Sequence, residues 1–300
     1  MSYSPSISVV MPVYNYGQFI KESIDSVLAQ TFSDFELIVL NDGSSDNSSE
    51  IAHSYLDKRV KVIDFPEKSV CYSTVRNAGM SVATGKHICV MDADDVCLPD
   101  RLENQYRFLE ENPEFGLIGG AYYILNTGRI SFRETDYETI KVHLLKYCYL
   151  HHPTCMIRSS LVRKHHLFYS ESYKYSADFD WEVRASSLFP VSNINTPVLL
   201  YRVHARQVSS SKRREQFSFV HQIRVKQLSF FGIEPSELEK ALHIAFIHET
   251  VDPRFDENAI DQWIVKLLEA NRRTGYFSQQ KLKSFLQAHQ YRYTHLIRQT

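Results

Sequence analysis

Residues 7–48 read ISVVMPVYNYGQFIKESIDSVLAQTFSDFELIVLNDGSSDNS, and this stretch decides the fold that we expect. It opens with the predominantly apolar run ISVVM, as in a strand buried on both faces. Apolar residues at helical spacing then predict a helix over 18–30, and FELIVL at 35–40 predicts a second buried strand. Strand, helix and strand in this order predict a parallel βαβ unit with a right-handed crossover.

The alternation continues through the first third of the chain. Further strands are expected at 60–65 and 87–91, with helices at 47–56, 72–83 and 99–111. The predicted fold class is therefore α/β, a mainly parallel sheet flanked by helices, whose ligands bind beyond the carboxyl ends of the strands. The polar clusters that directly follow strands should meet at that edge: Tyr14-Asn15, Asn41-Asp42 and Asp92-Ala93-Asp94-Asp95.

The rest of the chain is less regular. Residues 115–124 and 198–201 are predicted as strands, and 137–149 and 159–165 as helices. Ser209–Arg214 indicates a linker or exposed turn, and almost everything beyond it is compatible with helix. The net positive charge of this tail is small, so we favour an ordinary solvated helical subdomain. The alternative is contact with anionic lipid or with a lipid diphosphate.

Composition narrows the classes of protein. The chain has 300 residues, of which 43% are hydrophobic and 23% charged, as in a folded protein, and its net charge of −1 gives no support to nucleic-acid binding. Neither an 18-residue apolar run nor a secretory signal is found. The five cysteines are odd in number and lack C-x-x-C spacing, which favours a reducing compartment. We expect a cytoplasmic protein, with any membrane contact peripheral, at the inner face of the plasma membrane.

Two polar clusters carry candidate chemistry. The three carboxylates of Asp92, Asp94 and Asp95 repel one another, so a hard divalent cation, Mg²⁺ or Mn²⁺, is their natural partner; the alternative is that Asp94 or Asp95 caps the next helix. Asp42 could accept hydrogen bonds from a nucleobase while Tyr14 lies on the face of its ring; the alternative is an ordinary turn and helix cap.

Taken together, ISVVMPVYN…NDGSSDNS, RNAG at 76–79 and MDADD at 91–95 resemble the nucleotide-sugar-binding half of the family 2 glycosyltransferases. HPT at 152–154, ADFDW at 177–181 and YRVH at 201–204 follow in that family's usual order. The resemblance implies a Rossmann-like GT-A fold. It also implies a glycosyltransferase domain over 1–210, with a nucleotide-sugar-binding half at 1–114 and an acceptor half at 115–210. The resemblance ends there, and the helical extension expected at 211–300 rests on its helix-compatible sequence alone.

The resemblance also implies roles on the donor side. Arg76 and Asn77 would hold the nucleotide. Asp92 and Asp94, on either side of Ala93, would form the D-x-D pair, with Asp94 on the cation that bridges the diphosphate. His204 could be a further metal ligand or a diphosphate contact; the alternative is a structural histidine that follows a strand. The residues of the base pocket would be Pro12, Val13, Tyr14 and Asn15, with Asp42 bonded to the base.

On the acceptor side, Asp178 matches the general base of the family. The family commonly has Glu-Asp at this point, whereas position 177 is Ala177, so Asp180 is kept as a rival base or acceptor contact. Trp181 would stack on an acceptor sugar, or else pack in the core. The segment before Arg76 usually carries a glycine, which Ser69–Ser73 lacks, so that loop should differ in shape. The pairs His151-His152 and His165-His166 are interpreted as loop residues.

The function implied is an inverting, metal-dependent glycosyltransferase that uses a nucleotide sugar, preferentially a UDP-sugar. The acceptor expected is a saccharide or a lipid-linked saccharide, in bacterial surface-polysaccharide assembly. A non-catalytic protein that binds nucleotide sugars or glycans is the first alternative, because Ala177 replaces an acidic residue. A sugar nucleotidyltransferase is disfavoured, because Pro12–Gly17 occupies the place of its glycine-rich loop.

Overall fold

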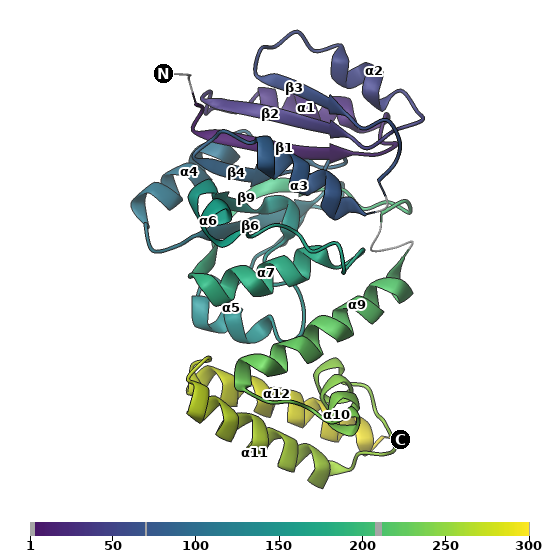
Figure 1. Ribbon diagram of the computed structural model, residues 1–300, viewed down its shortest axis with the longest axis vertical. Helices are drawn as coiled ribbons and strands as arrows, with labels where there is room; N and C mark the ends of the chain where they lie inside the picture. Colours follow the sequence, from purple (N-terminus) through teal and green to yellow (C-terminus); the bar gives the residue numbers. More distant parts are fainter. Residues whose placement is uncertain (1–3, 70, 208–211, 300) are drawn as a thin grey trace. The chain divides into compact units, whose positions relative to one another are not determined.

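The protein forms two compact units, each with its own hydrophobic core (Figure 1). The computed structural model describes residues 4–69, 71–207 and 212–299. The first unit comprises Met1–Thr135 and Tyr149–Arg213, and the second comprises Asp136–Cys148 and Arg214–Thr300.

The domain boundary expected from the sequence falls after residue 210. That point, with residues 209–211 of the expected linker and Val70 of the loop before Arg76, lies outside the described residues. Residues 136–148, expected in the first domain, group with the second unit, because Val142 and Leu145 pack into the helical core of that unit.

Among the described residues, the first unit has a nine-stranded mixed sheet in the order β3-β2-β1-β4-β8-β6-β9-β5, with β7 paired to β6. The first four strands in this order are mutually parallel, as predicted, and β6 and β9 are also parallel. The other pairings are antiparallel. The strands are β1 (Ile7–Val13), β2 (Phe35–Asn41), β3 (Val60–Asp64), β4 (His87–Val90), β5 (Val96–Cys97), β6 (Leu117–Ile124), β7 (Arg129–Ser131), β8 (Met156–Arg158) and β9 (Val191–Tyr201).

Helices accompany this sheet. Most begin and end within a few residues of the predicted bounds, and α6 matches them. The helix α7 and the short strands β5, β7 and β8 were not predicted. The helical elements are α1 (Ile20–Leu28), α2 (Ser48–His53), α3 (Tyr72–Val82), α4 (Arg101–Glu111), η1 (His152–Thr154), α6 (Ser159–His165) and α7 (Ala177–Leu188).

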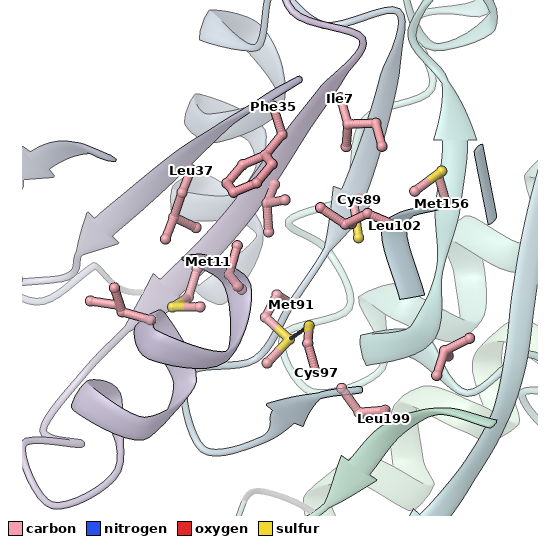
Figure 2. Packing of buried hydrophobic residues seen from close by; sticks show 14 of the residues in the cluster. Ile7, Met11, Phe35, Leu37, Cys89, Met91, Cys97, Leu102, Met156 and Leu199 are labelled. Atoms are coloured by element: carbon pink, nitrogen blue, oxygen red, sulfur yellow. Dashed lines mark hydrogen bonds between the residues drawn. The ribbon is translucent and has the colours of Figure 1, made fainter. Parts of the chain in front are cut away.

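Both faces of β1 and β2 are buried, which explains their unbroken apolar sequences. Side chains alternate between the two faces along a strand, so Ile7 and Met11 share a face with Phe35 and Leu37. Figure 2 shows these four side chains in one cluster with residues from several strands and with Leu102 of α4. The apolar stripe of α1 packs into the same cluster.

The opposite face of β1 and β2 receives α3, and Gly79 makes this approach possible. A Cβ atom at Gly79 would lie 2.6 Å from Leu40 Cδ1 and 2.6 Å from Val10 Cγ1. The helix therefore packs closer to the strands than any larger residue would permit. This close packing holds the start of α3 near the carboxyl ends of β1 and β2.

The strand β9 is longer than the sequence indicates, since only 198–201 was predicted. Its first part contains Asn193, Asn195 and Pro197, which are poor strand formers. The structure accommodates them with register shifts in the β6–β9 pairing, where Ala121 lies opposite Pro197.

The second unit is helical, as expected for the C-terminal region. Its core gathers large apolar side chains such as Phe246, Trp263 and Tyr293. Ser236 forms a capping box with Glu239, and Gly275 ends a helix in the left-handed conformation. The elements are α5 (Tyr137–His143), α9 (Arg213–Lys226), η2 (Gln227–Phe231), α10 (Glu237–His248), α11 (Glu257–Thr274) and α12 (Gln279–Ile297).

In the part of the chain that the structure describes, no helix has the length and apolar character needed to cross a membrane. None of the five cysteines, all of which lie in the described residues, forms a disulfide, and four of them are buried.

The loop interpretation of the histidine pairs is wrong for two residues. His152 begins η1 and is buried, and His165 is the last residue of α6. His166 adopts the left-handed conformation that ends α6. Spacing alone could not reveal this, because the partners of His152 come from distant parts of the chain.

Candidate active site

The carboxyl ends of β2, β1 and β4 lie side by side, since the three strands are adjacent and parallel. The clusters beginning at Tyr14, Asn41 and Asp92 follow these ends. Tyr72, the first residue of α3, lies near the clusters that contain Asp42 and Asp92. Burial raises the pKa of its phenol, and Arg76 lowers it. The carboxylates of Asp42, Asp92 and Asp94 each raise the same pKa further. Aspartates that are distant in sequence therefore act on one side chain.

The loop after β1 is tied to the loop after β2. Asn15 adopts a positive φ of 55°, and its Oδ1 accepts hydrogen bonds from the backbone N–H of Ser45 (2.8 Å) and Asp46 (3.3 Å). The side chain expected to bind nucleotide thus holds two loops together. Pro12 and Val13 are buried at the end of β1.

Two other side chains of the expected base pocket are held in place by the 67–69 segment. Lys68 Nζ lies 3.8 Å from the ring centroid of Tyr14. Asp42 is 3% exposed, and its Oδ1 accepts a hydrogen bond from the backbone N–H of Ser69 at 2.7 Å. Gly43 allows this contact: its φ is +63°, and a Cβ there would lie 2.4 Å from the carbonyl carbon of Glu67.

The aspartates after β4 form a cluster. One carboxylate oxygen from each of Asp92, Asp94 and Asp95 lies within 4.8 Å of the other two. Ser23 of α1 fixes the backbone here, because its Oγ donates to the carbonyl oxygens of Ala93 (2.8 Å) and Asp95 (2.6 Å). Ala93 itself is buried and leaves the carboxylates on either side of it close together.

The electrostatics of the cluster suit a cation. Burial raises the pKa of Asp94, and the charge of Asp92 raises it further, whereas His204 lowers it. The pKa of Asp95 lies well above its usual range for the same reasons, burial first. Its buried Oδ2 has no hydrogen-bond partner in the described chain. Hard oxygen ligands with unmet charge are what Mg²⁺ or Mn²⁺ binds, so the residues present fit such an ion.

His204 and Arg202 enclose the cluster from the end of β9. His204 Nε2 lies 2.8 Å from Asp94 Oδ2. The backbone N–H of Arg202 donates to Asp95 Oδ1 at 2.9 Å, and its Nε donates to the carbonyl oxygen of Asp94 at 2.7 Å. The structure thus brings His204 to the aspartates, 110 residues away in sequence.

Arg76 and Asn77 are neighbours with different contacts. Arg76 Nη2 donates to Asp92 Oδ1 at 2.9 Å. Asn77 uses both ends of its amide on the backbone of Tyr169: Nδ2 donates to the carbonyl at 2.9 Å, and Oδ1 accepts from the N–H at 2.8 Å. Asn77 therefore ties α3 to the segment before α7 through both ends of its amide.

The first turn of α7 separates the two candidate bases. The side chain of Asp178 is partly exposed and partly buried. Its burial raises the pKa of the carboxyl, whereas the charge of Arg76 lowers it. Asp180 is 1% exposed and accepts a hydrogen bond from Arg184 Nε at 2.6 Å. Asp180 is thus inaccessible to an acceptor, whereas Asp178 shares the surroundings of Arg76.

Trp181 is a core residue. It is 0% exposed, stacks on Tyr169 with ring centroids 5.2 Å apart, and donates from Nε1 to the carbonyl oxygen of Leu167 at 3.1 Å. Neither face of the Trp181 ring is exposed to a sugar. Trp181 therefore packs in the core, which was the alternative to an acceptor contact.

Tyr16 and Tyr72 belong to this site but were missed in the sequence. The phenol of Tyr16 lies in the field of Asp94, and its ring contacts that of His204 edge-on at 5.6 Å. Tyr72 precedes Arg76 by four residues on α3, a spacing that puts both on one helix face and was the available signal.

The profile described as Glycosyl transferase family 2 matches residues 8–167. The chain belongs to glycosyltransferase family 2. An uncharacterized glycosyltransferase of Haemophilus influenzae is 30% identical to it over 250 residues, which is 77% of this chain and 76% of the relative. The O-antigen biosynthesis glycosyltransferase WbnJ of Escherichia coli is 30% identical over 215 residues, 68% of this chain and 82% of WbnJ.

Solved structures share the fold of this family 2 glycosyltransferase. Residues 1–349 of Staphylococcus aureus TarS, in complex with UDP-GlcNAc, superimpose with a TM-score of 0.67 at 19% identity, over 98% of this chain and 92% of that one. The mannosyltransferase PcManGT of Pyrobaculum calidifontis, in complex with GDP-Man and Mn²⁺, gives 0.60 at 16% identity, over 97% and 86%. The expected GT-A fold is confirmed, and membership of the family makes the protein a glycosyltransferase with a nucleotide-sugar donor.

Proposed function

We propose that this glycosyltransferase is metal-dependent and inverts the anomeric configuration, with Asp178 as its general base. The observation that carries the proposal is electrostatic: the Arg76 guanidinium lies in the fields of both Asp92 and Asp178. The positive charge of the Arg76 side chain thus acts both on the aspartate cluster and on the candidate base.

The donor would lie across the carboxyl ends of β1, β2 and β4. In this proposal Tyr14, with Pro12 and Val13, lines the base pocket and Asp42 accepts from the base. The Asp92–Asp95 cluster holds a divalent cation, chiefly through Asp94, with His204 at its side. Mg²⁺ or Mn²⁺ bound there would offset the negative charge that develops on the departing diphosphate.

Asp178 has the properties that the acceptor step requires. An acceptor hydroxyl that attacks the anomeric carbon must lose its proton as the bond forms, and a carboxylate within reach can take it. Burial raises the pKa of Asp178, which makes its carboxylate a stronger base than a solvated aspartate. A single displacement without a covalent intermediate inverts the configuration at that carbon.

For the donor we propose a UDP-sugar, and for the acceptor a saccharide or lipid-linked saccharide of a surface polysaccharide. A structural neighbour and a relative support these two proposals: TarS is seen with UDP-GlcNAc, and WbnJ is an O-antigen biosynthesis glycosyltransferase. GDP is the competing nucleotide, since PcManGT is seen with GDP-Man. Location in the cytoplasm, with peripheral contact at the inner face of the plasma membrane, belongs to the same proposal.

The test measures release of nucleoside diphosphate from a panel of UDP- and GDP-sugars, with Mn²⁺ and with EDTA. We expect turnover that requires the metal and is lost in Asp178→Asn, while binding of UDP to that variant, measured by calorimetry, is retained. Asp180→Asn, with its fold verified by circular dichroism, is the matched control and keeps turnover. Full activity of Asp178→Asn would remove the base assignment, and binding without any turnover in wild type would favour a non-catalytic binding protein, the alternative that Ala177 suggests.

A further inference from the structure

A second group of metal-ligating side chains lies in the first unit, apart from the Asp92–Asp95 cluster. It consists of His152 in η1, Cys155 just before β8, and Glu182 in α7. One ligand atom from each lies within 4.8 Å of the other two. His152 is 6% exposed, and Cys155 and Glu182 are both 0% exposed.

Two atoms of this group lack partners. Glu182 Oε2 accepts hydrogen bonds from the backbone N–H of Tyr149 (3.0 Å) and Leu150 (3.2 Å), but within the described chain Oε1 accepts and donates none. His152 Nδ1 is likewise without a hydrogen bond among the described residues. Burying an unpaired polar atom costs the free energy of its lost hydration, so two such atoms in one small space indicate a missing ligand.

The alternative is a cluster of uncharged side chains that binds no ion. Burial raises the pKa of Glu182 and lowers that of His152, so burial disfavours the charged form of each side chain. A neutral carboxyl still has an O–H to donate, and a neutral imidazole still has two ring nitrogens to satisfy. No hydrogen bond joins these side chains in the described structure, so neutrality does not account for the arrangement.

We propose that His152, Cys155 and Glu182 bind a Zn²⁺ ion. Imidazole nitrogen, thiolate sulfur and carboxylate oxygen are the three ligand types of zinc in proteins. Tetrahedral bonds of about 2.0–2.3 Å place ligand atoms about 3.3–3.8 Å apart, too far for good hydrogen bonds and inside the observed 4.8 Å limit. The fourth position is left to a water molecule, as in other zinc sites with three protein ligands.

Charge and surroundings also fit. One thiolate, one carboxylate and a neutral imidazole balance the two charges of the ion, so no net charge is buried. Tyr169 Oη lies 3.1 Å from His152 Nε2 and can accept a hydrogen bond from the N–H at that position, which leaves Nδ1 for the metal. Glu182 is oriented by the two backbone N–H groups at its other oxygen. The thiolate sets this site apart from the all-oxygen Asp92–Asp95 cluster, which suits harder ions.

The consequence is a cross-link between distant segments. The ion would fasten the middle of α7 to the turn at 152–155. Asp178 lies one helical turn before Glu182 on α7, so the same bond would fix the start of that helix.

To test this, the full chain is expressed in medium supplemented with Zn²⁺ or Co²⁺ and purified without added metal. The amount of bound metal per chain is then measured. We expect one zinc per chain and, with cobalt, the near-ultraviolet charge-transfer absorption that a thiolate–cobalt bond produces. Both should persist in Asp94→Asn, which alters the other cluster, and in Cys71→Ser, a buried thiol outside the group. Both should be lost in Cys155→Ser and in Glu182→Gln.

A more conservative variant tests the site in a chain that is expected to fold normally. Tyr169→Phe removes only the hydroxyl and should weaken retention of zinc against a competing chelator about 10–100-fold, with an unchanged circular dichroism spectrum. Folded wild type that carries no zinc and shows no thiolate–cobalt absorption would overturn the proposal. So would an absorption that survives Cys155→Ser and disappears in Cys71→Ser.

Discussion

Arg76 Nη2 and Asp92 Oδ1 form an ion pair at 2.9 Å, with the side chains only 17% and 29% exposed. The same guanidinium lies in the field of Asp178, which comes from α7. Arg76 therefore partly neutralises two acidic groups that would otherwise repel each other at the proposed donor site. This pair orients the first aspartate of the cluster, and Arg76 also lowers the pKa of Asp178 against the larger effect of burial.

Replacing Arg76 by methionine should damage catalysis more than folding. The change removes the cation and keeps an apolar stem of similar length, so we expect kcat/KM to fall on the order of 10²-fold, the effect of losing one preorganised charged donor. The measurement is steady-state release of nucleoside diphosphate. Arg59→Met is the control, because its ion pair with Asp57 is an ordinary surface pair and its loss should leave kcat/KM unchanged. Equal losses in both variants would refute a special role for Arg76.

The pH dependence of turnover should report Asp178. A base acts in its ionised form, and burial raises the pKa of this carboxyl, so activity should disappear as pH falls through a value above that of a solvated aspartate, about 3.9. Arg76 lowers the same pKa, so Arg76→Met should move the acidic limb of kcat/KM to higher pH. An acidic limb that stays in place in the variant would show that another group controls it.

Ser23 should matter for the aspartate cluster although it carries no charge. It is fully buried, and its Oγ holds the carbonyl oxygens of Ala93 and Asp95. Ser23→Ala should lower the free energy of unfolding by about 1–3 kcal/mol, because two buried carbonyls lose a donor, and it should weaken Mn²⁺ binding. Denaturant unfolding and calorimetry measure the two effects. Ser54→Ala, at an exposed hydroxyl, is the control and should change neither.

Gly79→Ala should destabilise the first unit. Its Cβ would enter the space of Leu40 and Val10 at 2.6 Å, and overpacking of this kind costs about 1–3 kcal/mol. The control on the same helix is Ser81→Ala, whose exposed hydroxyl bonds only to the preceding turn at Asn77. A midpoint of thermal unfolding that is equal in the two variants would contradict the close packing of α3 described above.

The first third of the fold could be predicted because its signals are local. Apolar runs without alternation mark β1 and β2, and polar clusters that follow strands mark the ligand-binding edge. The β5, β7 and β8 strands are two or three residues long and owe their pairing to neighbours in space, which no local pattern records. The early part of β9 contradicts its own propensities and is held by pairing with β6.

The site was predictable as a set of residue types, less so as a set of contacts. Asp92, Asp94 and His204 meet as expected, since strand ends fix them. Trp181 and Asn77 occupy motif positions but are used in packing and in a backbone bridge, and only the surrounding structure decides between these uses. His152 is a similar case, because Glu182 reaches it from 30 residues away along the chain.

Asn77 offers a direct test of that distinction. The structure commits both ends of its amide to the backbone of Tyr169, so Asn77→Ala should lower the free energy of unfolding by about 1–3 kcal/mol while the Kd for UDP with Mn²⁺ stays unchanged. Tyr72→Phe is the matched comparison: its phenol lies among the aspartates, so it should weaken UDP binding with little loss of stability. A weakened Kd in Asn77→Ala at unchanged stability would restore the nucleotide contact that the family resemblance implies, because an amide that served only the backbone could not produce it.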